Sequence, residues 1–210
     1  MKIKDKKKNH RAKSSKLSIL RLNKEYNLLR ASPVNKTFVL VDETNLYIWH
    51  FLIYGLDDLM YAGGYYYGKI IIPKGYPYYA PKIVFVTPTG CFPTNEELCF
   101  YLDETKLDTW NAEWVIGSLL QTVITELHDY KGDEDKCFQD INEQRQKCAQ
   151  KSLSYNCQNK DFMNHFHPYF HKLGIIRERK QTSDSCSNDS ALLDVLACLC
   201  ECAANLFACE

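Results

Sequence analysis

The strongest constraint on the fold comes from four apolar runs that follow one another between residues 36 and 88. They read KTFVLVD, LYIWHFLIYG, GYYYGKIII and PKIVFVTP, and all are rich in the β-branched and aromatic residues that favour strands. Short segments separate them. Connections this short join antiparallel neighbours, because a parallel pair needs a crossover of a dozen or more residues. The sequence therefore predicts a four-stranded antiparallel meander sheet.

Helical periodicity marks segments on both sides of these runs. Between residues 15 and 30 apolar side chains recur at spacings of three and four, and Pro33 ends the pattern. A second apolar pattern, over residues 115–127, indicates a central core helix. Residues 137–156 and 160–173 indicate two more helices. We therefore expect an α+β fold, with an N-terminal helix, a central helix and C-terminal helices around the sheet.

The chain of 210 residues is long enough for one domain of ordinary size and an appendage. We expect a basic N-terminal arm at residues 1–14, a core at 15–171, a polar linker at 172–189 and a tail helix at 190–210. The first sixteen residues carry eight Lys or Arg and one Asp. A terminus of this kind is usually solvated, and docking to a protein or to an anionic membrane is the alternative.

The net charge excludes few classes of function, because 26 basic residues balance 26 acidic ones. A tyrosine-rich band at residues 61–79 lacks the interleaved Arg and Lys of base-stacking surfaces, so packing in the sheet is the better interpretation and we expect no nucleic acid partner. No apolar core follows the N-terminal lysines, so we expect no secretory signal and a cytosolic protein. The ten cysteines are then expected as free thiols.

The tail reads SALLDVLACLCECAANLFACE and is strongly apolar. It also holds Asp194 and Glu201, and a charged residue near the middle of a membrane costs about 2.5 to 3.5 kcal/mol. We therefore favour an amphipathic helix, peripheral to a membrane or packed on protein, over a spanning anchor. The tail cysteines lack the C-x-x-C spacing of a zinc knuckle, and His165, His167 and His171 would reach them only through distant folding, so no metal is expected.

Cys99 lies in a long segment without strand alternation that follows Pro88. Loops of this length inside compact domains are usually functional, so Cys99 is either a nucleophile or a buried structural thiol. The acids around it would raise the pKa of its thiol, which argues against a protease-like thiolate. His50 is the nearest histidine upstream, and we interpret it as a packed strand residue. Acyl transfer from a ready-made thioester is the chemistry that fits best.

Several segments in one order carry a family resemblance: RLNKEYNLLRASP, YAGGYYYGKIIIP, GYPYYAPKIVFVTP, NEELCF and DTWNAEW. In this order they resemble the ubiquitin-conjugating enzymes. Within that family the chain is most similar to the branch that is tail-anchored in the endoplasmic reticulum membrane and serves protein degradation. That branch has Thr-Pro-Asn-Gly where this chain has TPTG at residues 87–90, and the similarity extends to about residue 170.

The resemblance implies that Cys99 accepts ubiquitin as a thioester from an activating enzyme and passes it, with a ligase, to a lysine or hydroxyl of a protein substrate. ATP is used upstream by the activating enzyme, so no bound cofactor is implied. Thr89 stands where the family has an asparagine that supports the oxyanion. Asn95 aligns with another family asparagine, and it either supplies an amide or stabilises its own loop.

Further supporting residues are implied in the loop after Cys99. Lys106 stands where the related branch has a histidine, and a cation there would favour the thiolate and the oxyanion. The acids Asp103, Glu104 and Asp108 could help the acceptor amine to lose its proton.

Partner contacts are also implied by the resemblance. Lys13, Lys16 and Arg21 would contact the activating enzyme, unless they are only a solvated helix face. Tyr78, Ala112 and Glu113 would contact the ligase, with Glu113 adding a charge to a normally apolar contact. Two other functions remain open: an inactive relative that only binds ubiquitin or a ligase, and a cysteine hydrolase.

Overall fold

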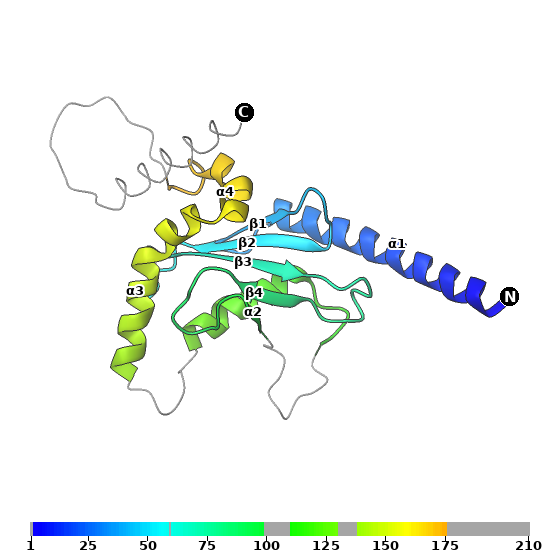
Figure 1. Ribbon diagram of the computed structural model, residues 1–210, viewed down its shortest axis with the longest axis horizontal. Coiled ribbons are helices and arrows are strands. Elements are labelled where there is room, and N and C mark those ends of the chain that lie inside the picture. Colours follow the sequence, from blue (N-terminus) through cyan, green and yellow to red (C-terminus); the bar gives the residue numbers. More distant parts are fainter. Residues whose placement is uncertain (1, 59, 99–109, 130–137, 176–210) are drawn as a thin grey trace.

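A five-stranded antiparallel sheet forms the centre of the molecule (Figure 1). The computed structural model describes residues 2–58, 60–98, 110–129 and 138–175. The strands run in sequence order across the sheet: β1 (Thr37–Val41), β2 (Ile48–Tyr54), β3 (Tyr65–Ile71), β4 (Lys82–Phe85) and β5 (Glu97–Leu98). The four predicted runs form β1 to β4, which confirms the meander. The fifth strand was not predicted, since two residues are too short to show alternation.

One face of the sheet carries the main core. Trp49, Phe51 and Ile53 alternate along β2 and point to this face, where α2 (Ile116–Asp129) packs across the sheet. The apolar side chains of α2 are buried there at helical spacing, so the predicted central helix is confirmed. Leu22 joins the same cluster from the N-terminal helix.

The opposite face is covered by the C-terminal end of α3 (Phe138–Cys157), by α4 (Lys160–Phe166) and by the 3-10 turn η1 (His167–Tyr169), while Ala149 of α3 joins the main core. A second cluster forms here, in which Leu52 and Tyr67 of the sheet pack with Phe162, Phe166 and Phe170. Burial on both faces explains why β2 is an almost continuous apolar run instead of an alternating one.

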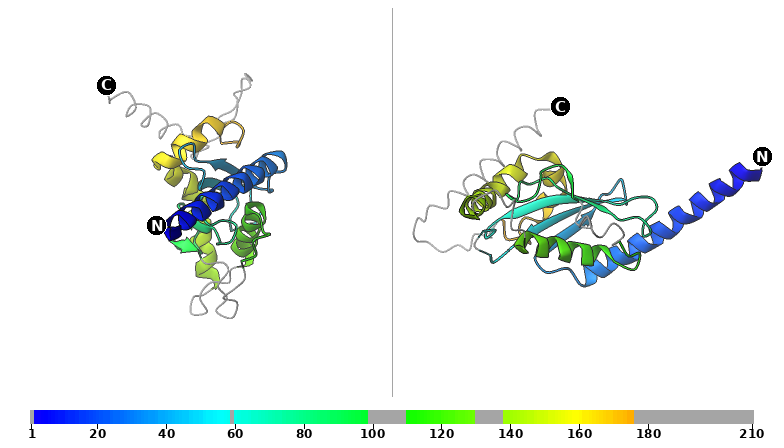
Figure 2. Two further views of the ribbon diagram at one scale, coloured as in Figure 1. Left: turned by 90° about the vertical axis from the view of Figure 1, so that its right-hand side faces the viewer. Right: turned by 90° about the horizontal axis from the view of Figure 1, so that it is seen from below.

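The N-terminal helix α1 (Lys2–Ala31) begins well before the predicted start at residue 15. Lys and Arg are good helix formers, and neither Gly nor Pro occurs between residues 2 and 31, so the basic residues continue the same helix. The N-terminal half extends away from the sheet (Figure 2). The Ser18 hydroxyl lies 2.5 Å from the carbonyl oxygen of Tyr76 and 3.1 Å from that of Lys74, so it ties the helix to the loop that holds both. The helix ends just before Ser32 and Pro33, as predicted.

The predicted linker at residues 172–189 is described only as far as Ile175, and the predicted tail at 190–210 lies outside the described residues. Within the described part of the chain, no helix combines the length and apolarity that crossing a membrane requires.

Candidate functional site

The segment that leads to Cys99 starts with a buried threonine. The Thr87 side-chain oxygen accepts the amide N–H of Tyr67 on β3 at 2.8 Å, and its hydroxyl donates to the side-chain oxygen of Asn156 on α3. Thr87 is fully buried. The start of the TPTG motif is therefore fixed between the sheet and α3.

The second threonine of the motif holds the next turn. Thr89 is also fully buried, and its side-chain oxygen accepts the amide N–H groups of Phe92 at 2.9 Å and Cys91 at 3.3 Å. Gly90 has a positive φ of 80°, and a Cβ at this position would lie 2.8 Å from the Cα of Arg145 on α3. Glycine is therefore required here for both conformation and space. Oxyanion support by Thr89 stays a prediction.

A second cysteine lies in the same turn. The Sγ of Cys91 is 3.3 Å from the side-chain oxygen of Thr89 and 3.5 Å from the hydroxyl of Tyr61. Burial raises the pKa of the Cys91 thiol. Cys91 is therefore held as a neutral thiol and has the character of a structural cysteine.

Asn95 makes the turn that returns the chain to the sheet. Its φ is 62°, in the left-handed region that asparagine tolerates better than most residues, and its amide N–H donates to the carbonyl of Phe85 at 2.7 Å. Two residues later the chain forms β5, in which buried Leu98 pairs with Ile83 of β4. This geometry rests on the backbone of Asn95, and both interpretations of its side chain stay predictions.

The next residue after Leu98 is Cys99. Cys99 lies outside the described residues, as do Asp103, Glu104, Lys106 and Asp108. The described structure thus fixes the chain up to the immediate neighbour of the proposed nucleophile.

A buried carboxylate that the sequence patterns did not predict links α1 to the loop before β4 and to the start of α2. Glu25 on α1 is 3% exposed and accepts hydrogen bonds from the hydroxyl of Tyr76 at 2.7 Å, from the amide N–H of Ile116 at 2.8 Å and from the guanidinium of Arg21. The amide of Ile116 is the first of α2, so Glu25 caps that helix from a distance. The sequence contained one sign of this role, because Glu25 is a charged residue among the apolar positions of α1.

The predicted partner residues lie on segments that contact one another. Arg21 donates to the carbonyls of Glu113 at 3.3 Å and Trp114 at 3.0 Å, and the indole N–H of Trp110 donates to the carbonyl of Pro77 at 2.6 Å. These bonds join α1, the loop at residues 73–79 and the loop at 110–114. Arg21 therefore has a structural role, and its contact with an activating enzyme stays a prediction.

Exposure differs among the remaining partner residues. Tyr78 is 74% exposed, Lys16 and Glu113 are exposed, and Ala112 is half-buried. Lys13 is part of α1, but its side chain lies outside what the structure describes. The same three segments expose further apolar side chains, namely Leu17, Leu20, Tyr79 and Trp114.

His50 is a packed strand histidine, as predicted. It is 2% exposed on β2, its Nδ1 lies 2.9 Å from the hydroxyl of Tyr67, and its ring stacks on that of His165 from α4 at 3.7 Å. Burial lowers the pKa of His50 to about 4. His50 thus lies on the sheet face that α4 covers.

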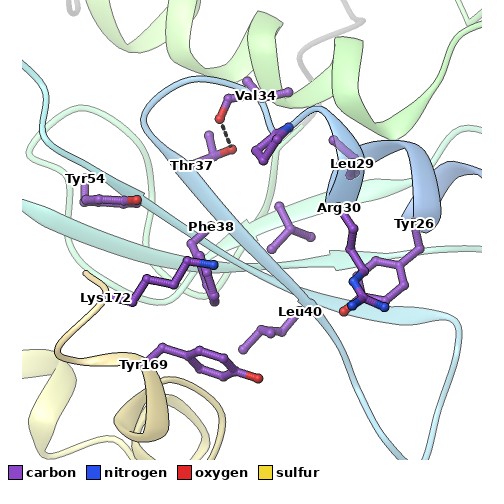
Figure 3. A pocket seen from close by; sticks show the side chains of 12 residues that line it. Tyr26, Leu29, Arg30, Val34, Thr37, Phe38, Leu40, Tyr54, Tyr169 and Lys172 are labelled. Atoms are coloured by element: carbon purple, nitrogen blue, oxygen red, sulfur yellow. Dashed lines mark hydrogen bonds between the residues drawn. The ribbon is translucent and has the colours of Figure 1, made fainter.

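A cavity of about 600 Å³ lies between the end of α1, β1 and the turn η1. Figure 3 shows Phe38, Leu40 and Tyr169 around it, with Arg30 and Lys172 among the lining residues. β1 and β5 are at opposite edges of the sheet, so this cavity is not part of the segment that precedes Cys99.

Comparison with known proteins defines the class. The family model for ubiquitin-conjugating enzymes matches residues 21–157. Two Arabidopsis thaliana relatives, ubiquitin-conjugating enzymes E2 33 and E2 34, are each 31% identical to this chain over 159 residues. The matched region is 76% of this chain and 65% and 67% of those proteins. Ubiquitin-conjugating enzyme E2 J2 of Mus musculus is 28% identical over 168 residues, which cover 80% of this chain and 63% of the relative.

A solved structure supports the fold of this family. A crystal structure from Plasmodium yoelii, described as a ubiquitin conjugating enzyme, superposes with a TM-score of 0.54 over 64% of this chain and 94% of that chain, at 23% identity. The chain belongs to the ubiquitin-conjugating enzyme family. It spans about two thirds of the length of the first relatives it matches.

Proposed function

We propose that this protein is a ubiquitin-conjugating enzyme with Cys99 as its acceptor thiol. The Cys99 thiolate attacks the carbonyl of the thioester that links ubiquitin to the activating enzyme, and the thiolate of that enzyme leaves. An amine or hydroxyl of a protein substrate then attacks the new thioester. The acceptor loses its proton, and the Cys99 thiolate leaves.

The observation that supports this most directly is the anchoring of the segment before Cys99. Thr87, Thr89 and Leu98 tie that segment to β3, to its own turn and to β4. Reactive groups are usually carried by loops on a rigid scaffold of this kind. A thioester site also needs no strongly activated thiolate, which suits a loop whose neighbouring residues are acidic.

We place ligase and activating-enzyme binding on the joined segments of α1 and the loops at residues 73–79 and 110–114. Large aromatic side chains dominate binding energy at protein interfaces, and Tyr78 is exposed enough to act as one. The lysines of α1 add positive charge beside it, which would attract an acidic partner.

We further propose a role in protein degradation, in the cytoplasm and at the cytosolic face of the endoplasmic reticulum. The support is the TPTG motif and the apolar tail at residues 190–210. Fractionation of the full chain and of a chain ending at residue 189 tests the membrane contact. If both chains stay equally in the supernatant, the tail has no such role.

The activity is tested by incubating the full chain with activating enzyme, Mg-ATP and ubiquitin. We expect one ubiquitin adduct that a thiol reductant removes. Cys99→Ala should lose the adduct, and Cys99→Ser should form one that survives the reductant, because an oxyester replaces the thioester. Cys91→Ser is the matched control in the same loop and should charge like the wild type.

Other outcomes identify the alternatives. A well-folded wild type that forms no adduct would support a binding module that has kept only the fold. Cleavage of a ubiquitin thioester or isopeptide without any acceptor would support a hydrolase. An adduct that persists in Cys99→Ala would place the acceptor on another thiol.

A further inference from the structure

Three potential metal ligands converge beneath α4, on the sheet face away from α2. They are Asp42 at the end of β1, His50 on β2 and His165 on α4. The Oδ2 of Asp42 lies 3.5 Å from the Nε2 of His50 and 3.7 Å from the Nε2 of His165. All three atoms lie within 4.8 Å of one another. The activity proposed for Cys99 makes no use of this cluster.

The carboxylate of Asp42 is held with one oxygen facing the histidines. Its Oδ1 accepts three hydrogen bonds from the following turn, from the amide N–H of Thr44 at 2.8 Å, the Thr44 hydroxyl at 2.6 Å and the amide N–H of Asn45 at 2.9 Å. These bonds fix the orientation of the side chain. Oδ2 therefore remains available as a ligand atom.

The two imidazoles are oriented in the same manner through their other nitrogens. The Nδ1 of His165 lies 2.7 Å from the backbone carbonyl of Asp161, so this nitrogen carries the hydrogen and donates it. The Nδ1 of His50 lies 2.9 Å from the hydroxyl of Tyr67. A histidine that binds a metal almost always makes such a bond with its second nitrogen, because the bond fixes the tautomer and the ring orientation. The Nε2 atoms are thus left to face Asp42.

We propose that Asp42, His50 and His165 form a binding site for a divalent transition metal of the zinc type. The Nε2 of His165 offers a lone pair, because its hydrogen is on Nδ1. The Nε2 of His50 donates to Oδ2 of Asp42 at 3.5 Å when it carries the hydrogen, and it offers a lone pair to a cation once the hydrogen is on Nδ1, facing the Tyr67 hydroxyl. Zinc bonds to these atoms are about 2.0 to 2.2 Å long, so tetrahedral ligands lie about 3.4 Å apart. The separations of 3.5 and 3.7 Å from the carboxylate are close to this value, and the ligand atoms all lie within 4.8 Å of one another. The two imidazole rings are stacked, so they must also turn for both Nε2 atoms to face one ion.

The charge and exposure of the surroundings are compatible with such an ion. Lys69 is opposite His50 on β3, but its ammonium group pairs with the carboxylate of Asp161 at 2.6 Å, which offsets its charge. The side chains of Asp42 and His165 are 20% and 19% exposed. Water can therefore reach the fourth position of a tetrahedral ion.

A metal at this place would join the β1–β2 hairpin to α4, which is more than 100 residues further along the chain. Asp42 and His50 belong to the sheet, and His165 belongs to the helix that covers it. Because the ligands meet only in the folded chain, binding would stabilise the packing of α4 on the sheet.

The test is a titration of the metal-stripped full-length protein with Co²⁺, followed by visible and near-ultraviolet absorption and by thermal unfolding with Zn²⁺. The variants are His165→Ala and Asp42→Asn, in which the asparagine oxygen can still accept the bonds from Thr44 and Asn45. His171→Ala is the control, an exposed histidine of the same C-terminal region. Thiols bind cobalt as well, but they produce an intense charge-transfer band that nitrogen and oxygen ligands do not.

We expect the wild type and His171→Ala to bind one Co²⁺ with weak visible bands that lack thiolate character. These bands should require about tenfold or more Co²⁺ to reach half saturation in His165→Ala and Asp42→Asn. Zn²⁺ should raise the midpoint of thermal unfolding only in the wild type and in His171→Ala. The proposal is overturned if the wild type shows only thiolate-type bands, if it shows none, or if His165→Ala binds like His171→Ala.

Discussion

Glu25 joins three parts of the molecule through one carboxylate. It lies on α1, but its hydrogen bonds reach the loop before β4 through Tyr76 and the start of α2 through Ile116. A buried carboxylate is tolerated only when it is paired and fully hydrogen-bonded, and here both oxygens are used. The same contacts position the loops at residues 73–79 and 110–114, where the ligase contact is proposed.

Replacing this carboxylate should destabilise the protein. Glu25→Gln removes the negative charge and replaces one of the two acceptor oxygens by an NH2 group that cannot accept, so at least one of the donors Arg21, Tyr76 and Ile116 loses its partner. We expect a loss of about 2 kcal/mol in the free energy of unfolding. Urea denaturation measures it. Glu143→Gln removes a solvent-exposed partner of Lys147 on α3 and should cost at most about 0.5 kcal/mol. Equal losses in the two variants would show that Glu25 does not join these elements energetically.

At the scale of elements, α3 is attached to the sheet through two polar side chains one helical turn apart. The Ser152 hydroxyl oxygen accepts the amide N–H of Tyr65 at 2.9 Å, and the Asn156 amide donates to the carbonyl of Tyr65 at 2.7 Å. Asn156 also accepts the hydroxyl of Thr87. The helix thus completes the hydrogen bonding at the start of β3 and fixes the loop that leads toward Cys99.

The variant Asn156→Leu keeps a similar volume and removes the two bonds that Asn156 makes, to Tyr65 and Thr87. The carbonyl of Tyr65 and the hydroxyl of Thr87 would lose buried partners, so we expect a loss of about 2 to 3 kcal/mol in the free energy of unfolding. Gln150→Leu makes the same replacement at an exposed position of α3 and should change it by less than about 0.5 kcal/mol. Chemical denaturation compares the two, and an unchanged Asn156→Leu would show that the bonds of Asn156 do not stabilise the attachment of α3.

The whole molecule divides into a body packed on both faces of the sheet and a basic half-helix that extends from it (Figures 1 and 2). Within the described part of the chain, the side-chain contacts of α1 with the body begin at Ser18 and continue through Leu22 and Glu25. The residues before Ser18 bring most of the positive charge of the helix, since eight of the first sixteen are Lys or Arg.

Deleting residues 1–13 should separate the contribution of α1 to stability from its contribution to binding the activating enzyme. We expect little change in the thermal unfolding midpoint, because the contacts from Ser18 onward remain. Charging by the activating enzyme should slow by up to about tenfold at low ionic strength, and the difference should shrink as salt screens the attraction. Single-turnover charging rates at two salt concentrations measure the effect. Charging that is equally fast at low salt would exclude a docking role for the basic helix.

The strands and helices were predictable because their signals are local. Each strand run is a short apolar segment bounded by turn residues, and each helix repeats apolar side chains every three to four residues. Two features could not be predicted, because they leave no such local pattern. The two-residue strand β5 is too short to show a pattern, and the continuous helix through the basic arm depends on propensity alone, since it has no apolar stripe.

The sequence by itself determined the four main strands, the position of Pro33 as a helix end, and the likeness to a family centred on Cys99. Only the tertiary structure decided that Glu25 caps α2, that Asn156 completes β3, and that Asp42, His50 and His165 share one site. The physical reason is that a buried polar group is stabilised by whichever partner the fold brings to it. Glu25 and Ile116 are 91 positions apart, and no local pattern encodes such a contact.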